Sequence, residues 1–382
     1  MVINGGERIE IVQVQRPAQW REYFDLPADL YRQHPAWVQP LALHNRQTWA
    51  PRNPVFRHLE AAAWLARRGN RVVGRICAQD DRLQLAQGRP ELGQFGQLEA
   101  IDDAAVFEAL LNAAGGWLRG RGKRRMQGPF DLTINQQCGL LVEGFDVSPA
   151  MMMPFHPPFY AGQLEALGLH PVVEMLAYRG ASDYAVPTSV ARLLERTAGR
   201  LSFRPVSRGE LSDHAEIMRA LFNACWADNW GFIPITREEF AHMVQEMKPL
   251  VWPGYVQIAW QGETPVGFIV VLPDLNGLIR DLAGRLLPFG WARLLWRLAR
   301  RRAGMVRVLL MGVTPEHHQS LMGAAIGYGL IESTRRHVLA DGVSRSEQSW
   351  ILADNRGMRA MVEAIGMQVA ARYRIFEREI GA

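Results

Sequence analysis

Three polar side chains at one long irregular stretch are the first candidates for chemistry in this chain. Residues 129–158 show little helical or strand periodicity, and Asn135, His156 and Tyr160 lie within this stretch or just after it. An irregular stretch of this length is uncommon in a compact domain unless it lines a site. Because imidazole titrates near neutrality, His156 is a candidate base or proton carrier, and the alternative is a turn histidine. Asn135 either orients a carbonyl group or caps the turn.

The same stretch holds a cysteine and a run of methionines. Cys138 is a candidate nucleophile, but no base lies near it in sequence, so we expect a small buried side chain. Met151–Met153 belong either to the core or to a pocket for an alkyl chain, because thioethers are flexible and apolar.

Histidines elsewhere do not form a metal-binding pattern. His317 and His318 are adjacent in sequence, and adjacent helical side chains point about 100° apart. No cysteine or carboxylate at metal-ligand spacing accompanies them. We therefore expect no metal site.

The composition is that of a folded protein with a basic surface. The chain has 382 residues, of which 48% are hydrophobic and 21% charged, and its formal net charge is +5. This charge favours anionic partners such as phosphates or acidic lipids. Three cysteines without CxxC spacing favour a reduced, cytoplasmic setting. The first residues lack a secretory pattern and no apolar run of about 18 residues occurs, so we expect neither a signal peptide nor a bilayer-spanning segment.

Two similar patterns indicate that the chain contains a duplication. Residues 158–179 and 354–376 both carry a short helix, a glycine and a strand that ends in aromatic and arginine residues. The strand pairs around 71–81 and 264–274 match at nearly the same offset. Two matches at one offset predict tandem domains. We place them at 1–180 and 201–382, with a linker at 181–200.

Hydrophobic periodicity predicts similar elements in both copies. In the first copy we expect strands at 8–15, 93–101, 124–129 and 171–179, a hairpin over 61–79, and helices at 17–33, after Asp102-Asp103, and at 159–168. In the second copy we expect strands at 201–206, 305–313, 346–353 and 367–377, a hairpin over 254–273, and helices at 209–226, 236–246, 316–339 and 355–365. Each copy is an α+β domain with one mixed central sheet flanked by helices.

An additional basic segment at 275–304 interrupts the second copy. Within it, residues 277–302 contain seven arginines, two tryptophans and one acid, Asp281, and Pro288 and Gly290 divide them into two short helices. This composition suits a segment that lies in a membrane interface with arginines on anionic headgroups. The alternative is a helical pair packed on the domain with its arginines in water. Nucleic-acid binding is not expected, because no groove-reading motif accompanies the basic residues.

The order of elements resembles the GNAT superfamily of acyl-CoA-dependent N-acyltransferases. The second copy carries VLLMGV, then Thr314-Pro315 and a helix, and later the ending WILADNRGMRAMVEAIGMQVAARYRIF, which is similar to GNAT C-termini. In the first copy, GPFDLTINQQCGLLVEGFD followed by MMMPFHPPFY resembles a family of double-GNAT proteins that includes bacterial ceramide synthases.

The resemblance implies that acyl-CoA is a co-substrate, with no permanently bound cofactor, and that a helix N-terminus holds its pyrophosphate. In the second copy the implied residues are Val313, Thr314, His318, Gln319, Gly323 and Asn355. Only Gly323 matches the superfamily pattern R/Q-x-x-G-x-G/A, so a plain capped helix is the alternative. In the first copy Asp102-Asp103 would repel a pyrophosphate. We therefore assign acyl-CoA to the second copy and acceptor shaping to the first.

The resemblance also implies two catalytic candidates. Glu99 stands near the end of a strand where several GNAT enzymes carry a general base, and its alternative is a solvated strand edge. Tyr373, on the last strand, is a candidate donor to the CoA sulfur, and its alternative is a packing tyrosine.

We therefore expect a tandem GNAT-like enzyme that transfers a long-chain acyl group from acyl-CoA to a lipid-like amine, and the resemblance suggests a sphingoid base. Segment 277–302 would place it peripherally on the cytoplasmic face of the inner membrane. The rival interpretations are a GNAT enzyme with a soluble amine acceptor and a non-catalytic GNAT-like regulatory module.

Overall fold

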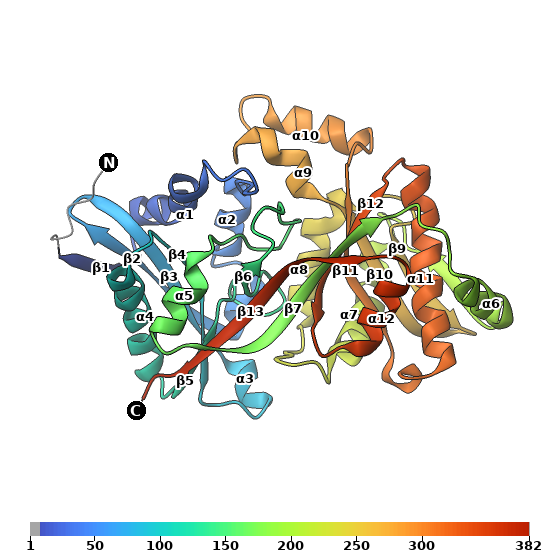
Figure 1. Cartoon of the computed structure of the whole chain (residues 1–382), viewed down its shortest axis with the longest axis horizontal. Helices are drawn as coiled ribbons and strands as arrows, with labels where there is room; N and C mark the ends of the chain where they lie inside the picture. Colours follow the sequence, from blue (N-terminus) through green and yellow to red (C-terminus); the bar gives the residue numbers. More distant parts are fainter. Residues whose placement is uncertain (1–7, 382) are drawn as a thin grey trace. The chain divides into compact units, whose positions relative to one another are not determined.

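The computed structural model describes residues 8–381 and forms two compact units (Figure 1). The first unit contains the chain up to Met175 and the C-terminal residues from Ala371 onward. The second unit contains Leu176–Ala370. Residues 1–7, on which part of the signal-peptide expectation rests, lie outside the described residues.

The sheet of the first unit has the strand order β1-β2-β3-β4-β5-β13. These strands are β1 (Ile9–Gln13), β2 (Leu59–Arg68), β3 (Arg71–Asp81), β4 (Leu92–Ala100), β5 (Arg125–Gly128) and β13 (Gln368–Glu379). Neighbouring strands are antiparallel except β4 and β5, which are parallel. A short strand, β6 (Leu140–Glu143), pairs with β13 inside the irregular stretch.

Helices cover both faces of this sheet. The helices are α1 (Pro17–Tyr31), α2 (Ala42–Thr48), α3 (Arg82–Ala86), α4 (Ala104–Arg119) and α5 (Phe159–Ala166), with a short 3-10 turn, η1 (Pro54–Arg57). Gly74 of β3 faces α4, because a Cβ atom there would lie 2.7 Å from Leu110. Cys77 of the same strand packs with Tyr23 of α1. Residues that differ by an odd number along a strand face opposite sides, so α1 and α4 lie on opposite faces of the sheet.

The second unit repeats this arrangement with the strand order β7-β12-β11-β10-β9-β8. Its strands are β7 (His170–Ala181, from Leu176 onward), β8 (Ser202–Pro205), β9 (Val256–Gln261), β10 (Thr264–Pro273), β11 (Val306–Val313) and β12 (Arg345–Leu352). Its helices are α6 (Thr188–Thr197), α7 (Leu211–Trp226), α8 (Arg237–Met247), α9 (Leu275–Ile279), α10 (Gly290–Ala299), α11 (Leu321–Ala340) and α12 (Arg356–Ala364), with 3-10 turns η2 (Lys248–Leu250), η3 (Arg280–Leu282) and η4 (Pro315–His317).

Both units contain one pair of parallel strands that separates after three residue pairs. β4 and β5 pair only from Leu92 to Gln94, although β4 continues to Ala100. β11 and β12 pair only from Val306 to Val308, although β11 continues to Val313. Each sheet therefore opens between its two parallel strands, and the same opening in both units agrees with a duplicated domain.

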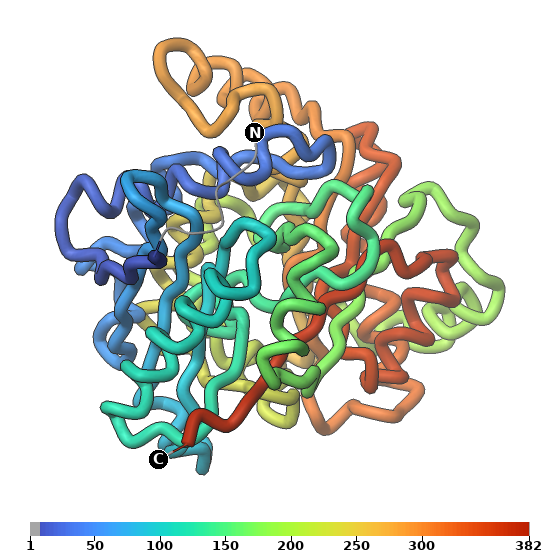
Figure 2. Tube along the Cα trace, turned by 60° about the vertical axis from the view of Figure 1, so that its left-hand side comes forward, coloured from blue at the N-terminus to red at the C-terminus, as the bar shows by residue number. Residues whose placement is uncertain are grey.

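The unit boundaries differ from the expected division at 181–200. The C-terminal part of β13 pairs antiparallel with β5, from Phe376–Gly128 to Glu379–Arg125, so the last strand belongs to the first unit. Figure 2 shows the red C-terminal strand ending among the blue-green segments of that unit. Helix α6 takes up half of the expected linker and belongs to the second unit.

The expected elements agree with the observed ones to within a few residues, with one clear correction. Helix α11 begins at Leu321 rather than at 316, because the Ser320 hydroxyl accepts the Gly323 N–H at 3.0 Å and caps the helix there. The residues before it form the turn η4. The short helix α2 was not expected from the sequence.

Candidate active site

The first unit encloses a hydrogen-bonded cluster around Glu99. Glu99 lies on β4, Tyr31 is the last residue of α1, and Tyr160 lies on α5. The Tyr31 hydroxyl donates to Glu99 Oε2 and is also hydrogen-bonded to the Tyr160 hydroxyl. The Tyr160 oxygen accepts the Ala100 N–H at 2.8 Å and lies 3.4 Å from Glu99 Oε2. Three elements therefore converge on one carboxyl group.

A bulge in β4 positions this carboxyl group beside an arginine. Arg75 is the cross-strand partner of Glu99, and the register between β3 and β4 shifts before the next pair, Cys77 and Gly96. Gln97, within the bulge, has a positive φ of 45°. Such bulges redirect side chains and are common beside active sites. Arg75 Nη2 lies 3.6 Å from Glu99 Oε1, and its Nη1 donates to the Tyr23 carbonyl at 2.7 Å.

Burial sets the protonation of this cluster. The Glu99 side chain is 12% exposed, and burial raises its pKa to about 7, although Arg75 and the Tyr31 hydroxyl act in the opposite direction. Burial also raises the pKa of Asp131 to about 6, again against the effect of Arg75. The pKa values of Tyr31 and Tyr160 are raised far above the usual range, mainly by burial, so both remain hydroxyl donors. A solvated strand edge does not describe Glu99.

His156 is packed beside the cluster, but its environment does not suit a base. Its ring lies 5.3 Å from the Tyr160 ring, and its Nδ1 accepts the Leu141 N–H at 3.3 Å. Burial lowers its pKa to about 3, because an enclosed imidazolium would lose its hydration. The imidazole is therefore neutral near pH 7 and supports the backbone of β6.

Other residues of the irregular stretch lie in a turn or are buried in the apolar interior. The backbone N–H of Asn135 donates to Thr133 Oγ1 at 3.3 Å within a turn, and the role of the Asn135 side chain stays a prediction. Cys138 is 3% exposed, and its Sγ lies 4.0 Å from Met175 Sδ, so it belongs to the apolar interior. Met151 and Met153 are buried as well.

Tyr373 and the phosphate-loop candidates of its sequence copy belong to different units. Tyr373 is 2% exposed, belongs to the first unit and pairs with Leu141 of β6. A Cβ atom on Gly139 would lie 3.1 Å from the Tyr373 Cβ, so the two strands approach closely there. Tyr373 is therefore buried between strands, and its role as a donor to the CoA sulfur stays a prediction.

The opening between the parallel strands is filled in the first unit. The Phe130 N–H donates to the Phe95 carbonyl at 2.9 Å, and a Cβ atom on Gly96 would lie 1.6 Å from the Phe130 carbonyl oxygen. At the adjacent helix, Asp103 caps α4 by accepting the Ala105 N–H at 2.9 Å and is paired with Arg68 at 2.7 Å. Backbone therefore fills the opening between β4 and β5, and the Asp103 carboxylate occupies the N-terminus of α4, where it disfavours a pyrophosphate.

The corresponding loop of the second unit is a tight turn between β11 and α11. His318 Nε2 is hydrogen-bonded to the Val313 carbonyl at 2.8 Å, and the Thr314 N–H donates to the Val266 carbonyl at 3.0 Å. Gln319 adopts a positive φ of 55°. The loop thus brings Val313, Thr314, His318 and Gln319 together next to the start of α11.

The start of α11 is capped yet open to solvent. The Ser320 hydroxyl accepts a hydrogen bond from the Gly323 N–H. A Cβ atom on Gly323 would lie 2.1 Å from the His317 carbonyl oxygen, so glycine is required at this position. Leu321, the first helical residue, is 78% exposed, which leaves the helix N-terminus accessible to an anion. Asn355 does not lie in this turn; its side chain caps α12 by accepting the Met358 N–H at 3.0 Å.

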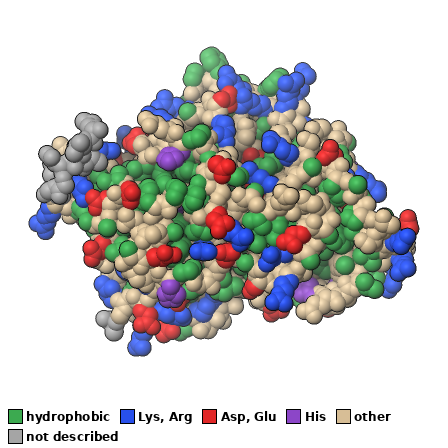
Figure 3. Space-filling view, in the orientation of Figure 1, with side chains coloured by type: hydrophobic (Ala, Val, Ile, Leu, Met, Phe, Trp, Pro, Cys, Tyr) green, Lys and Arg blue, Asp and Glu red, His purple; other side chains and the backbone are tan. Residues whose placement is uncertain are grey.

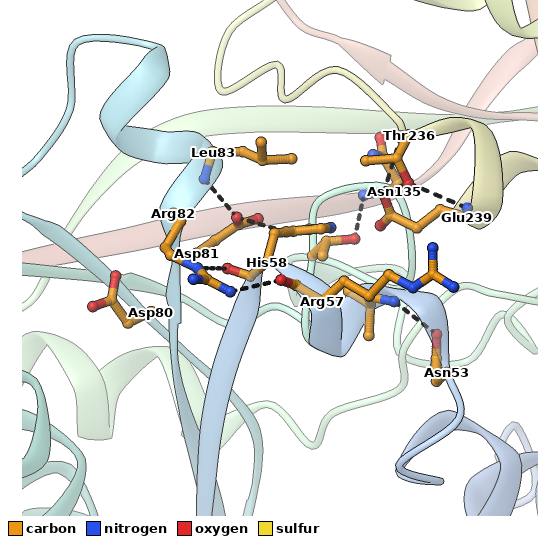
Figure 4. Close-up of polar contacts among 12 residues, drawn as sticks. Asn53, Arg57, His58, Asp80, Asp81, Arg82, Leu83, Asn135, Thr236 and Glu239 are labelled. Atoms are coloured by element: carbon orange, nitrogen blue, oxygen red, sulfur yellow. Dashed lines mark hydrogen bonds and ion pairs between the residues drawn. The ribbon is translucent and has the colours of Figure 1, made fainter.

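Sequence reasoning missed Tyr31, Arg75 and Asp131. A charged Arg75 within the otherwise apolar run VVGRICA was a usable signal, because a buried arginine requires a partner. It also missed a buried pair in which His58 Nδ1 lies 2.8 Å from Asp81 Oδ1. Asp81 also accepts the Leu83 N–H at 2.8 Å, so the pair fixes the turn into α3 (Figure 4).

The chain is similar in sequence to two known bacterial proteins. The chain is 39% identical over 361 residues to Protein YghO of Escherichia coli, covering 94% of this chain and 93% of that protein. It is 35% identical over 377 residues to the bacterial ceramide synthase of Caulobacter vibrioides, covering 97% of this chain and 98% of that protein. The chain belongs to the family that contains these two proteins. No protein-family model matches the chain.

Solved structures confirm the fold of this family member. A tandem GNAT protein from the clavulanic acid biosynthesis pathway, solved without AcCoA, superposes with a TM-score of 0.58 at 15% identity, over 98% of this chain and 99% of the other. The expected α+β fold with two GNAT-like domains is therefore confirmed. Among the described residues, no helix is both long and apolar enough to span a bilayer, and no cluster of three metal-ligating side chains occurs.

Proposed function

We propose that this protein transfers a long-chain fatty acyl group from acyl-CoA to the amine of a lipid-like acceptor, namely a sphingoid base. The observation that carries the proposal is the enclosed Glu99 carboxyl group, whose pKa of about 7 suits a proton acceptor at neutral pH. The acceptor class follows from 35% identity over nearly the whole chain to a bacterial ceramide synthase.

The proposed reaction is a direct acyl transfer. The neutral amine nitrogen attacks the thioester carbonyl, the carbon–nitrogen bond forms, and the carbon–sulfur bond breaks to release the CoA thiolate. Glu99 takes the proton that the amine loses, and this proton can then neutralise the thiolate. Tyr31 and Tyr160 remain protonated and hold the Glu99 carboxylate by hydrogen bonds. Glu99 is proposed for this role rather than His156, because the lowered pKa of His156 makes its imidazole a poor proton acceptor.

The acyl-CoA phosphates are assigned to the turn between Val313 and Gly323. Support comes from the exposed N-terminus of the 20-residue helix α11 and from the opening between β11 and β12. Backbone N–H groups and the helix dipole favour an anion at such a place. The Asp103 carboxylate at the start of α4 and the backbone between β4 and β5 disfavour a pyrophosphate in the first unit, which favours the second unit for this role.

The partner surface in this proposal is the inner membrane, reached through 277–302 from the cytoplasmic side. Five of the nine large apolar side chains that are exposed among the described residues lie here: Leu287, Phe289, Trp291, Leu295 and Trp296. At the top of Figure 3, where Figure 1 places α10, arginine and apolar side chains alternate.

The charges of this segment support the same partner. Asp281 is its single acid, and its carboxylate is paired with Arg293 at 2.8 Å and Arg297 at 2.6 Å. Seven arginines against one paired acid leave an excess of positive charge beside exposed tryptophans. Anionic headgroups and the outer acyl region match both features.

The test is amide formation by the purified full-length protein with acyl-CoAs of graded length and a sphingoid base. We expect N-acylated product to appear by mass spectrometry with long-chain donors and to be scarce with acetyl-CoA. Preference for acetyl-CoA with a soluble amine would replace the lipid acceptor by the soluble-amine alternative. A protein that binds no CoA in calorimetry would be a non-catalytic module.

A further inference from the structure

An apolar groove lies in the second unit between helices α7 and α8 and the sheet. Its lining includes Met218 of α7, Met243 and Met247 of α8, and Leu309 and Leu310 of β11. All 11 lining side chains are apolar. The enclosed part of the groove has a volume of about 30 Å³, and the rest of it is open to solvent. An enclosed volume of this size holds roughly one or two water molecules, so an alkyl chain enters only if lining side chains move.

The groove meets β11 where this strand leaves its regular pairing. Val270 pairs with Leu310 and Val271 pairs with Val308, so Leu309 is an extra residue that forms a bulge. Pairing of β11 with β12 also ends at Val308. A bulge turns neighbouring side chains away from their regular direction. At the edge of the groove, Leu309 therefore has no pairing partner in β10 or β12, whereas Leu310 still pairs with Val270 of β10.

The groove and the phosphate-loop turn are connected by the same strand. Val313 is the last residue of β11 and lies three residues after Leu310. Its carbonyl oxygen is hydrogen-bonded to the His318 ring in the phosphate-loop turn. Three strand residues span roughly 10 Å. A ligand whose phosphates lie at the turn and whose arm follows β11 would thus bring its far end to the groove.

We propose that this groove binds the alkyl chain of the acyl donor, an inference that rests on the proposed function. A lining without polar side chains cannot compensate the lost hydration of an amine or a phosphate, so it selects for hydrocarbon. Methionine side chains are flexible and adapt to chains of different length. Met243 and Met247 are only partly buried, so their side chains have room to move aside.

The groove has a measurable consequence for donor affinity. Each methylene that leaves water for an apolar site strengthens binding about fourfold, which is ~0.8 kcal/mol converted at room temperature. Affinity should therefore rise with chain length from acetyl-CoA and level off once the groove is filled. CoA without an acyl group should bind through the turn alone.

The test uses calorimetry on the full-length protein with CoA, acetyl-CoA, palmitoyl-CoA and palmitate. Met243→Trp narrows the groove, and Ala241→Trp, on the exposed side of the same helix, is the matched control. We expect Met243→Trp to lower the affinity for palmitoyl-CoA at least tenfold and to leave the affinity for CoA unchanged. Ala241→Trp should leave the affinities for palmitoyl-CoA and for CoA unchanged.

The outcomes separate the groove from the transferase proposal. If Met243→Trp keeps the full gain from acetyl-CoA to palmitoyl-CoA, the groove does not bind the chain and the inference is wrong. If no CoA compound binds but palmitate binds and is weakened by Met243→Trp, the groove is confirmed and the acyl-CoA proposal fails. If neither palmitate nor any CoA compound binds, both proposals are overturned.

Discussion

Replacing Glu99 by glutamine removes the proposed proton acceptor while keeping the size of the side chain. We expect kcat/KM for amide formation at pH 7 to fall by roughly 10²–10⁴-fold, the usual contribution of a positioned base. In the unchanged protein, kcat/KM should rise with pH through about 7, because only the ionised carboxylate accepts a proton. The variant should lose this rise.

The same substitution has a thermodynamic signature. The pKa of Glu99 is about 7 in the folded protein against a usual 4.5, a difference of about 2.5. At 1.36 kcal/mol per pKa unit, this corresponds to roughly 3 kcal/mol. The folded state binds more protons than the unfolded state between these two pKa values, so the free energy of unfolding falls as pH rises from about 4.5 through 7. Glu99→Gln should remove this part of the pH dependence.

The assay combines thiol release with urea denaturation between pH 4 and 9. Glu60→Gln is the control, because Glu60 lies on β2 of the same sheet with a side chain that is 65% exposed. The control should leave both the rate and the pH dependence of unfolding unchanged. Full activity in Glu99→Gln, or a pH profile that is flat through 7 in the unchanged protein, would refute the assigned role.

Three further substitutions test neighbouring parts of the account. Arg75→Met removes the guanidinium that lowers the pKa of Glu99, so the pH–rate profile should shift to higher pH; an unshifted profile would contradict the pairing. Leu321→Glu places a charge at the exposed start of α11 and should weaken CoA binding in calorimetry about fivefold relative to Leu321→Gln, from roughly 1 kcal/mol of repulsion between charges 4 Å apart in water. The double variant Leu287→Ser/Phe289→Ser should lower the binding to phosphatidylglycerol vesicles, measured by co-sedimentation, at least about tenfold, because each side chain contributes roughly 1.5–3 kcal/mol when buried. The control Leu85→Ser should leave vesicle binding unchanged. Equal vesicle binding by the double variant and the control would argue against the membrane surface.

Local periodicity was enough to predict most elements of this fold. The hairpin over 61–79 and the helix capped by Asp103 are determined by alternation, turn residues and a capping side chain, all of which are local. The start of α11 was missed because Pro315 is a common first helical residue, whereas the actual cap is Ser320. The unit to which β13 belongs depends on pairing with β5, more than 240 residues away, and no local pattern records such pairing.

The candidate site was only partly visible in the sequence. Glu99 was found through family resemblance, but its raised pKa results from burial beneath α1 and α5, which the strand sequence alone does not contain. Tyr31 gave no signal, because a tyrosine at the end of a helix is common and its contact with Glu99 spans 68 residues. His156 had the right side chain for a base, and its enclosed surroundings decide against that role.

The most direct test of the central claim measures thiol release and amide formation in one sample at pH 7, with palmitoyl-CoA and a sphingoid base. The account predicts one free thiol for each amide formed, and loss of both products in Glu99→Gln. Thiol release without amide, or amide formation that is unaffected by Glu99→Gln, would contradict it.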